Sequence, residues 1–279
     1  MKIHAGLTVL LTGASGGLGA FMTRAFADRK VKLALVAHPG IGLEKLRQEV
    51  ERSGVRASAL ACDLRDPAQR RAIVEQVTKE FGRIDILVNN AGVEFTSAFH
   101  ELSEENIRDI VSVNLESAMS LTRLVLPGML QRRSGHIVNI SSLAGKAAPA
   151  FQEPYAATKA GLIAFTFSLR ASYRRDGISA SVIVPGFVEA GIYAKLKEKS
   201  GCSAPALLGT SSPQSVASAV IRAIEHNQPE VIINPLPVRP LLALTAMFPS
   251  LGEWAISKTG GHEFFRSVAE SLKRRRPPE

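Results

Sequence analysis

The sequence has little cysteine and no long hydrophobic run, and each shortage excludes a class of protein. Its 279 residues include only Cys62 and Cys202, which lie far apart and have no neighbouring histidine. Such a pair offers neither a disulfide framework nor a zinc-binding spacing, so we expect a reducing compartment, a cytoplasmic location and no metal. The longest late apolar stretch, residues 241–248, is far shorter than the ~20 residues that span a bilayer. Met1 leads straight into a strand-like segment without a signal-peptide cleavage site, so we expect a soluble protein.

Acidic residues are in short supply relative to basic ones. The 34 Lys and Arg residues exceed the 25 Asp and Glu residues, which gives a formal net charge of +9. This charge favours anionic partners without choosing among them. Much of the excess is clustered, at Arg132 and Arg133, at Arg174 and Arg175, and at residues 273–276, with no aromatic residues interleaved to stack on bases. We therefore expect solvated surface charge and no nucleic-acid partner.

Short apolar runs alternate with longer amphipathic segments, a pattern typical of βαβ units in a parallel sheet. Seven runs are predicted as strands: residues 7–11, 32–36, 57–61, 86–88, 135–140, 179–184 and 230–233. Helices are expected between them, including residues 43–52, 67–81, 103–126 and 155–175. Capping side chains precede Pro67 and Pro213, and Gly54, Gly82 and Gly177 follow helix ends. The predicted fold class is α/β, with a parallel sheet of about seven strands and helices on both faces.

A glycine-rich turn follows the first predicted strand, in Gly13-Ala14-Ser15-Gly16-Gly17-Leu18-Gly19, and leads into an amphipathic helix. Glycine allows backbone conformations closed to other residues and lets the chain approach a phosphate, whose charge then faces the positive end of the helix. The turn therefore predicts a site for the diphosphate of a nucleotide. The alternative is a tight strand-to-helix turn without a ligand, and the spacing also differs from the common G-x-G-x-x-G pattern.

Four motifs in this order resemble the short-chain dehydrogenase/reductase family. They are the T-G-x-x-x-G-x-G turn, Asn89-Asn90-Ala91-Gly92, Ser142, and Tyr155-x-x-x-Lys159. The resemblance covers residues 5 to about 235 and implies a doubly wound, Rossmann-type sheet, a nicotinamide cofactor, and hydride transfer to or from a carbonyl or alcohol. We expect one dinucleotide-binding and catalytic domain over residues 1–235, which residues 236–279 extend as C-terminal helices.

Tyr155 and Lys159 are four residues apart at the start of a predicted helix, so both side chains project from one face. A phenol has an unperturbed pKa of ~10, and a nearby ammonium lowers it by favouring phenolate. Tyr155 then becomes a general acid or base. On its own, this spacing would be interpreted as a partly buried Tyr and a surface Lys without a catalytic role. The other motifs favour the catalytic interpretation instead.

Two further catalytic residues follow from the resemblance. Ser142 lies thirteen residues before Tyr155, the offset at which the family's serine binds the substrate oxygen; Ser141 is its competitor and would otherwise cap a turn. The family's asparagine corresponds to Asn114, which would hold a water that links Lys159 to solvent. The resemblance also implies that Lys159 holds the nicotinamide ribose.

The expected cofactor is NADP, with NAD as the alternative. In NAD enzymes of this kind an acidic residue ends the second strand, whereas here His38 stands there as a weak phosphate partner. Asp63 matches the family residue beside adenine, and a helix N-terminal cap is its equally weighted alternative. The complete set of expected cofactor-binding residues is Gly13, Ser15, Gly17, Leu18, Gly19, His38, Asp63, Leu64, Asn90, Ala91, Gly92, Tyr155, Lys159, Pro185, Gly186 and Val188.

The expected substrate loops are residues 94–99, 143–153 and 187–209, because ligands of such sheets lie beyond the carboxyl ends of the strands. Their aromatic and aliphatic residues favour an apolar carbonyl or alcohol such as a lipid, steroid or retinoid-like compound. The family's Thr after Val188 is replaced by Ala190, which removes one hydroxyl contact. The C-terminal segment with Trp254, Phe264 and Phe265 is expected to pack as an amphipathic helix, with pocket closure, dimer support or peripheral membrane contact as alternatives.

Two other functions compete with this interpretation. One is reduction of 3-oxoacyl thioesters on a carrier protein, where basic patches would meet an acidic carrier. The other is a cofactor-binding regulatory protein without catalysis, against which Ser142, Tyr155, Lys159 and Asn114 argue. We expect a homodimer or homotetramer, and the sequence does not give the direction of the reaction.

Overall fold

The computed structural model describes residues 1–275, so the last four residues of the predicted C-terminal extension, including Arg276 of its basic cluster, lie outside the described residues. One sheet of seven parallel strands has the order β3-β2-β1-β4-β5-β6-β7. The strands are β1 (Thr8–Thr12), β2 (Lys32–Ala37), β3 (Ala57–Ala61), β4 (Ile86–Asn89), β5 (Gly135–Ile140), β6 (Ile178–Pro185) and β7 (Glu230–Ile233). Each predicted strand is present, with ends that differ by at most a residue at either side.

Helices connect the strands and extend the chain beyond β7. They are α1 (Gly17–Ala27), α2 (Ile41–Arg52), α3 (Pro67–Phe81), α4 (Glu104–Val111), α5 (Ser117–Gln131), α6 (Ala144–Ala147), α7 (Glu153–Tyr173), α8 (Gly191–Ser200), α9 (Pro213–Glu225), α10 (Arg239–Met247), α11 (Pro249–Ser257) and α12 (Gly261–Arg274). Short helical turns occur at η1 (Phe99–Glu101), η2 (Ser112–Glu116) and η3 (Arg174–Asp176).

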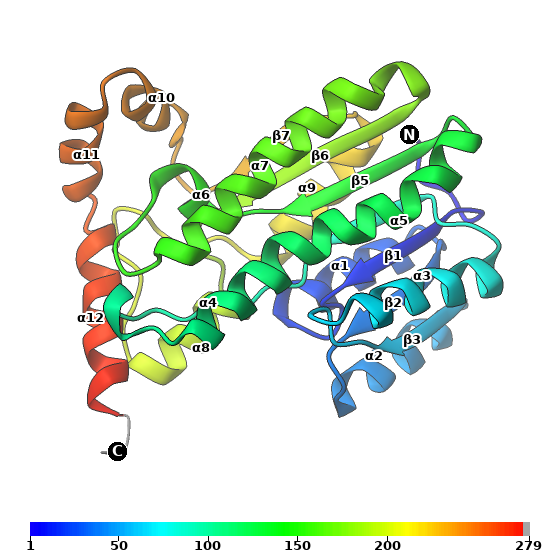
Figure 1. The fold of residues 1–279 in the computed structure, drawn as a ribbon, viewed down its shortest axis with the longest axis horizontal. Coiled ribbons are helices and arrows are strands. Elements are labelled where there is room, and N and C mark those ends of the chain that lie inside the picture. The colour runs from blue at the N-terminus through cyan, green and yellow to red at the C-terminus, as the bar shows by residue number, and fades with distance from the viewer. Residues whose placement is uncertain (276–279) are drawn as a thin grey trace.

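Helices cover both faces of the sheet, as Figure 1 shows. Side chains alternate across each strand, so Val9 and Leu11 pack with α1, α2 and α9 in one core, while Leu10 packs with α3, α5 and α7 in the other. Both cores consist mainly of buried aliphatic side chains, and the strands are buried on both faces, which is why they form continuous apolar runs in the sequence. The doubly wound, Rossmann-type fold predicted from the sequence is confirmed.

Local sequence signals explain the helix ends. The Asp66 side chain accepts hydrogen bonds from the amides of Ala68 and Gln69, an N-cap worth about 1 kcal/mol, and Pro67 occupies the first helical position of α3. Ser212 caps α9 in the same way. Gly82 ends α3 with a φ of 84°, a left-handed conformation that favours glycine.

The predicted helix over residues 103–126 is divided into two. Ser103 caps α4, and a π-helical turn, η2, then separates α4 from α5. A π turn inserts one residue into the helical repeat and turns the following side chains about the axis. Asn114 lies in this turn, and such turns are frequent at functional sites.

The order of the strands reverses between β1 and β4, and ligands of doubly wound sheets bind beyond the carboxyl ends of the strands at such a switch point. Helices α10, α11 and α12 lie together at one side of the molecule, away from the sheet (Figure 1). Over residues 1–275, no helix combines the length and apolar composition needed to cross a membrane. The division of the chain at residue 235 stays a prediction.

Candidate active site

A mostly apolar cavity of about 300 Å³ lies where the glycine turn, the ends of β4, β5 and β6, and the start of α7 meet. Helices α8, α10, α11 and α12 complete its walls. The cavity brings together these predicted site residues: Gly13, Gly17, Leu18, Asn90, Ala91, Gly92, Ser142, Tyr155, Lys159, Pro185, Gly186 and Val188.

Close packing requires three glycines of the turn. Gly13 has a φ of 64°, and a Cβ there would lie 2.9 Å from the Cα of Ala91. A Cβ on Gly19 would lie 2.0 Å from the carbonyl oxygen of Gly13, and one on Gly17 would lie 2.2 Å from the amide nitrogen of Gly191. These approaches shape the turn so that its backbone, and not side chains, faces the cavity.

The N-terminus of α1 fits an anionic group. Its N-cap is Gly16, which supplies no side-chain cap, and within residues 1–275 no side chain bonds the first-turn amides of the helix. Gly16, Gly17 and Leu18 all line the cavity, so these donors and the positive end of the helix face the same space. Gly16 was not among the predicted site residues, although it lies in the predicted turn.

Asn90 holds the ends of β1 and β4 together. Its side-chain Nδ2 donates to the carbonyl oxygens of Thr12 and Gly13, at 3.0 and 3.1 Å. In return the buried Thr12 Oγ1 accepts from the amides of Asn90 and Ala91, at 3.0 and 3.1 Å. Sequence reasoning missed this role of Thr12, whose only signal was its place directly before the glycine turn.

Tyr155 and Lys159 are both buried on the first turns of α7 and face the cavity. Burial raises the pKa of the Tyr155 phenol, a hydrogen bond with Ser142 lowers it, and the charge of Glu94 raises it further. Burial lowers the pKa of Lys159 to about 8. The phenol pKa therefore moves upward in this structure, opposite to the expected effect of Lys159, because burial outweighs the other effects.

The two adjacent serines have different partners. Ser142 Oγ accepts from the amide of Ala144 at 3.1 Å, and the Ser142 hydroxyl lies close enough to the Tyr155 phenol to lower its pKa. The hydroxyl of the buried Ser141 donates to the carbonyl oxygen of Lys159 at 2.8 Å. Ser142, which sequence spacing favoured, is thus the serine beside the phenol, and Ser141 joins β5 to α7.

Asn114 lies behind the cavity wall. Its Oδ1 accepts from the amide of Val93 at 2.8 Å, and its Nδ2 donates to the carbonyl of Val93 at 2.9 Å. A Cβ on Gly92 would lie 3.4 Å from Asn114 Oδ1 and 3.5 Å from Lys159 Nζ, so these two side chains flank Gly92. The water link between them stays a prediction.

Five of the predicted cofactor-binding residues do not line the cavity: Ser15, Gly19, His38, Asp63 and Leu64. Ser15 and His38 are exposed, and Leu64 is buried in a core. The alternative of Asp63 as a helix cap is wrong, because Asp66 caps α3.

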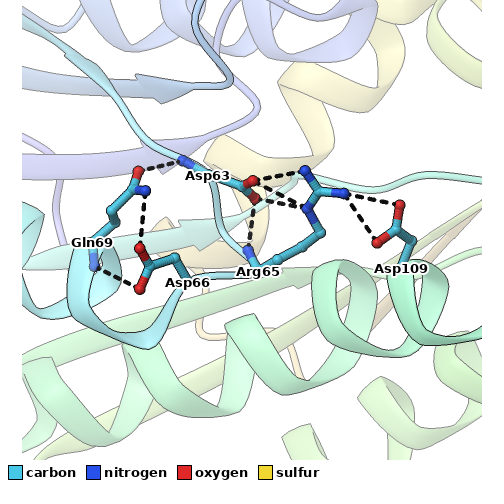
Figure 2. Close-up of polar contacts among 5 residues, drawn as sticks. All are labelled: Asp63, Arg65, Asp66, Gln69 and Asp109. Atoms are coloured by element: carbon cyan, nitrogen blue, oxygen red, sulfur yellow. Dashed lines mark hydrogen bonds and ion pairs between the residues drawn. The ribbon is translucent and has the colours of Figure 1, made fainter. Parts of the chain in front are cut away.

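Asp63 belongs to a surface ion-pair network (Figure 2). Arg65 donates to the Asp63 carboxylate at 2.7 Å and to the Asp109 carboxylate of α4 at 3.1 Å. The hydrogen bonds from Arg65 lower the pKa of Asp63 to about 2. The amide of Asp63 donates to the Gln69 side chain at 2.8 Å, and the charge of His38 is close enough to act on the carboxylate.

The substrate loops are only partly as predicted. Residues 143–153 and 187–209 contribute to the cavity, but Phe95 and Phe99 of the first loop point outward and are 37% and 54% exposed. Apolar composition did not distinguish an inward from an outward ring. Ala190 lies at the N-cap of α8, so the missing hydroxyl leaves that helix without a side-chain cap.

The C-terminal helices form one wall of the cavity. Phe264 and Phe265 of α12 pack with Phe187 and Tyr193 in an aromatic cluster, with ring centres 4.9 to 6.3 Å apart. Helices α10 and α11 line the cavity through Leu241, Leu242 and Ile256. Trp254 is exposed, unlike the two phenylalanines with which it was grouped in the sequence.

Comparison with known proteins gives consistent results. A family model described as short chain dehydrogenase matches residues 7–201. The ketoacyl reductase HetN of a Nostoc species is 41% identical, over 95% of this chain and 90% of its own length. A single-site variant of actinorhodin polyketide ketoreductase, solved with NADPH, has a TM-score of 0.77 and 30% identity, over 84% of this chain and 97% of that one. A metagenomic short-chain oxidoreductase in complex with NADP has a TM-score of 0.72 and 29% identity, over 85% of this chain and 100% of that one.

Proposed function

The chain belongs to the short-chain dehydrogenase family, and on that premise we propose that it is an NADP-dependent oxidoreductase for the carbonyl or alcohol group of an apolar substrate. The observation that carries the proposal is the cavity that joins the glycine turn at Gly13 and Gly17 to Ser142, Tyr155 and Lys159. Its mostly apolar walls favour a lipid, steroid or retinoid-like compound.

A nicotinamide dinucleotide fits the residues that are present. The uncapped N-terminus of α1 offers amides for the diphosphate, and Lys159 would hold the ribose beside Tyr155. The bound cofactor supplies or accepts hydride. The absence of an acid at the end of β2 favours NADP over NAD, and both solved relatives described above contain the phosphorylated form.

In reduction, Ser142 and Tyr155 polarise the substrate carbonyl by donating hydrogen bonds to its oxygen. Tyr155 then gives its phenolic proton to the oxygen of the product alcohol, and in oxidation it takes that proton back. The pKa of the Tyr155 phenol lies above its ordinary value of about 10, so the phenol holds the proton that reduction requires at neutral pH, while the same shift makes it a weaker acid. Lys159 contributes its positive charge next to the ring, 5.5 Å from the ring centre.

A second candidate, reduction of 3-oxoacyl thioesters, is favoured by the names of two relatives. HetN is described as a ketoacyl reductase, and the actinorhodin enzyme as a polyketide ketoreductase. A long apolar acyl chain would also suit the cavity walls.

The test is a spectrophotometric assay of NADPH and NADH oxidation with aldehydes, ketosteroids, retinal and acetoacetyl thioesters. We expect oxidation of NADPH by apolar carbonyl compounds, and Tyr155→Phe serves as the matched inactive variant. Activity with NADH alone would contradict the cofactor assignment. Silence with both cofactors would favour a regulatory role without catalysis.

A further inference from the structure

A buried polar cluster lies beside Tyr155, and the proposed reaction leaves it unused. Glu94 Oε1 accepts from the hydroxyl of Thr96 and from Gln152 Nε2, the latter at 2.9 Å. Gln152 Nε2 also donates to Thr96 Oγ1 at 3.1 Å. Gln152 is only 3% exposed and lines the cavity, whereas Glu94 stands behind it.

These contacts fix the orientation of the Gln152 amide. A carboxylate oxygen and a hydroxyl oxygen accept hydrogen bonds, so both N–H groups of Gln152 are directed at Glu94 and Thr96. A reversed amide would place its oxygen against the carboxylate. The Gln152 carbonyl oxygen Oε1 is therefore the free polar atom, and within residues 1–275 it has no hydrogen-bond partner. Oε1 is not among the fully buried atoms that lack a partner, so this acceptor is open to the cavity, where a water or a donor group of a substrate can reach it.

The position of Gln152 places this acceptor close to the reacting atoms. Its backbone carbonyl accepts from the amide of Ala156 at 2.7 Å, which fixes the start of α7 three residues before Tyr155. Gln152 is the N-cap of α7, and its side chain and that of Tyr155 both line one cavity. The charge of Glu94 also raises the pKa of the Tyr155 phenol.

We propose that Gln152 is a specificity-determining residue that accepts a hydrogen bond from an O–H or N–H group of the substrate, and that Glu94 is the positioning residue that holds it. The inference rests on the proposed function and narrows its substrate class. The substrate is an apolar carbonyl compound with a hydrogen-bond donor close to its reacting carbonyl.

The environment of Glu94 supports its role in positioning Gln152. Burial raises the pKa of Glu94 to about 7, against the hydrogen bonds from Thr96 and Gln152 and the charge of Lys199. A carboxyl group kept in such surroundings is costly, and groups of this kind gather at functional sites. A purely structural cap for α7 would need no carboxylate at all, since neutral side chains serve as well.

The test compares an apolar hydroxyketone with its methyl ether, which removes the donor and leaves the ketone unchanged. We expect the wild-type protein to prefer the hydroxyketone by about tenfold in kcat/KM, mainly through KM, because one buried hydrogen bond is at stake. Gln152→Met should abolish this preference. Glu94→Gln should reduce it, since a neutral amide at that position can donate to Gln152 and release its orientation. Phe99→Ala, an exposed residue outside the cavity, is the control and should keep the preference.

Binding of the same pair to the protein with oxidised NADP, measured by calorimetry, gives a readout that does not need turnover. If the wild-type protein shows the same kcat/KM and the same affinity for the hydroxyketone and its methyl ether, the proposal is overturned. Equal losses for both compounds in Gln152→Met would also overturn it, since they indicate only a structural role at the start of α7. Selective binding without turnover would support Gln152 while contradicting the proposed function.

Discussion

The ammonium of Lys159 lies 5.5 Å from the centre of the Tyr155 ring, and its hydrogen bond goes to the carbonyl oxygen of Ile140 at 2.9 Å. The ammonium is thus anchored at the end of β5 and faces the flat side of the phenol. Burial raises the pKa of Tyr155 and lowers that of Lys159 to about 8, so at neutral pH the phenol is protonated and the ammonium keeps most of its charge. The structure accordingly presents a protonated phenol to the cavity.

Replacement of the phenol tests this arrangement directly. Tyr155→Phe removes the transferable proton but keeps the ring, so we expect turnover to fall by at least about a thousandfold, as for loss of a general acid. NADPH affinity, measured by fluorescence titration, should change little. Tyr173→Phe is the matched control, because Tyr173 packs on a core away from the cavity. Full activity in Tyr155→Phe would contradict the assignment.

The lowered pKa of Lys159 predicts a pH-dependent cofactor affinity. Its pKa is about 8, so the ammonium that would hold the ribose loses its charge as the pH rises through 8. We expect the dissociation constant of NADPH to increase between pH 7 and pH 9. A tenfold increase would correspond to a loss of about 1.4 kcal/mol of binding free energy. Lys159→Arg, which stays charged in this range, should give a flat profile. An unchanged affinity in the wild-type protein would show that Lys159 does not hold the cofactor.

The sequence predicted the strands well because each is buried on both faces and therefore forms a short apolar run. It could not predict the π turn that contains Asn114, since one inserted residue shifts the phase of an apolar pattern by only about 100°, which a broad apolar face can absorb. It did predict the cap of α3, because Asp66 stands directly before Pro67, and the structure confirms Asp66 as the N-cap.

For the candidate site, too, some residues could be predicted from the sequence and others could not. Motif spacing identified Ser142, Tyr155 and Lys159, which the structure places at one cavity. Glu94 and Gln152 carry no motif, and their relation depends on a tertiary contact between a loop and the start of α7. Phe95 and Phe99 were expected at the substrate, but a short loop has no periodicity from which the direction of a ring can be inferred.

The neighbouring serines give a paired prediction. Ser142→Ala removes the hydroxyl beside the phenol, so we expect kcat/KM to fall about a hundredfold with little loss of stability. Ser141→Ala removes the buried bond to the carbonyl oxygen of Lys159 and should cost about 1 to 3 kcal/mol of unfolding free energy. Urea denaturation and steady-state kinetics on both variants separate the effects. The reverse pattern would exchange the roles of the two residues.

Histidine 136 predicts a loss of stability in acid. His136 is buried in β5 and donates from Nε2 to Ser181 Oγ at 2.9 Å, because that hydroxyl itself donates to the carbonyl of Gln228. Burial lowers the folded-state pKa of His136 to about 3, whereas the unfolded value is about 6.5. The unfolded state therefore binds the proton first, so this contribution to stability is complete above pH 6.5 and is lost as the pH falls toward 3.

Urea denaturation at pH 7.5 and pH 4.5 measures this effect. Two pH units below the unfolded pKa correspond to about 2 to 3 kcal/mol. The free energy of unfolding of the wild-type protein should therefore fall between pH 7.5 and pH 4.5. His136→Gln removes the titrating group, so the fall in this variant should be smaller by about 2 to 3 kcal/mol. Equal losses in both proteins would show that other groups carry the acid sensitivity.

The end of β2 predicts how cofactor preference can be changed. His38 is exposed where NAD enzymes of this kind carry an acid, and it lies near the Asp63 carboxylate. His38→Asp supplies an acceptor for a ribose 2′-hydroxyl and repels a 2′-phosphate, so we expect the ratio of kcat/KM for NADPH to that for NADH to fall at least about tenfold. His100→Asp makes the same charge change at an exposed residue of η1 and controls for net charge. If both variants lower the NADPH preference equally, general electrostatics and not contact at the ribose would account for it.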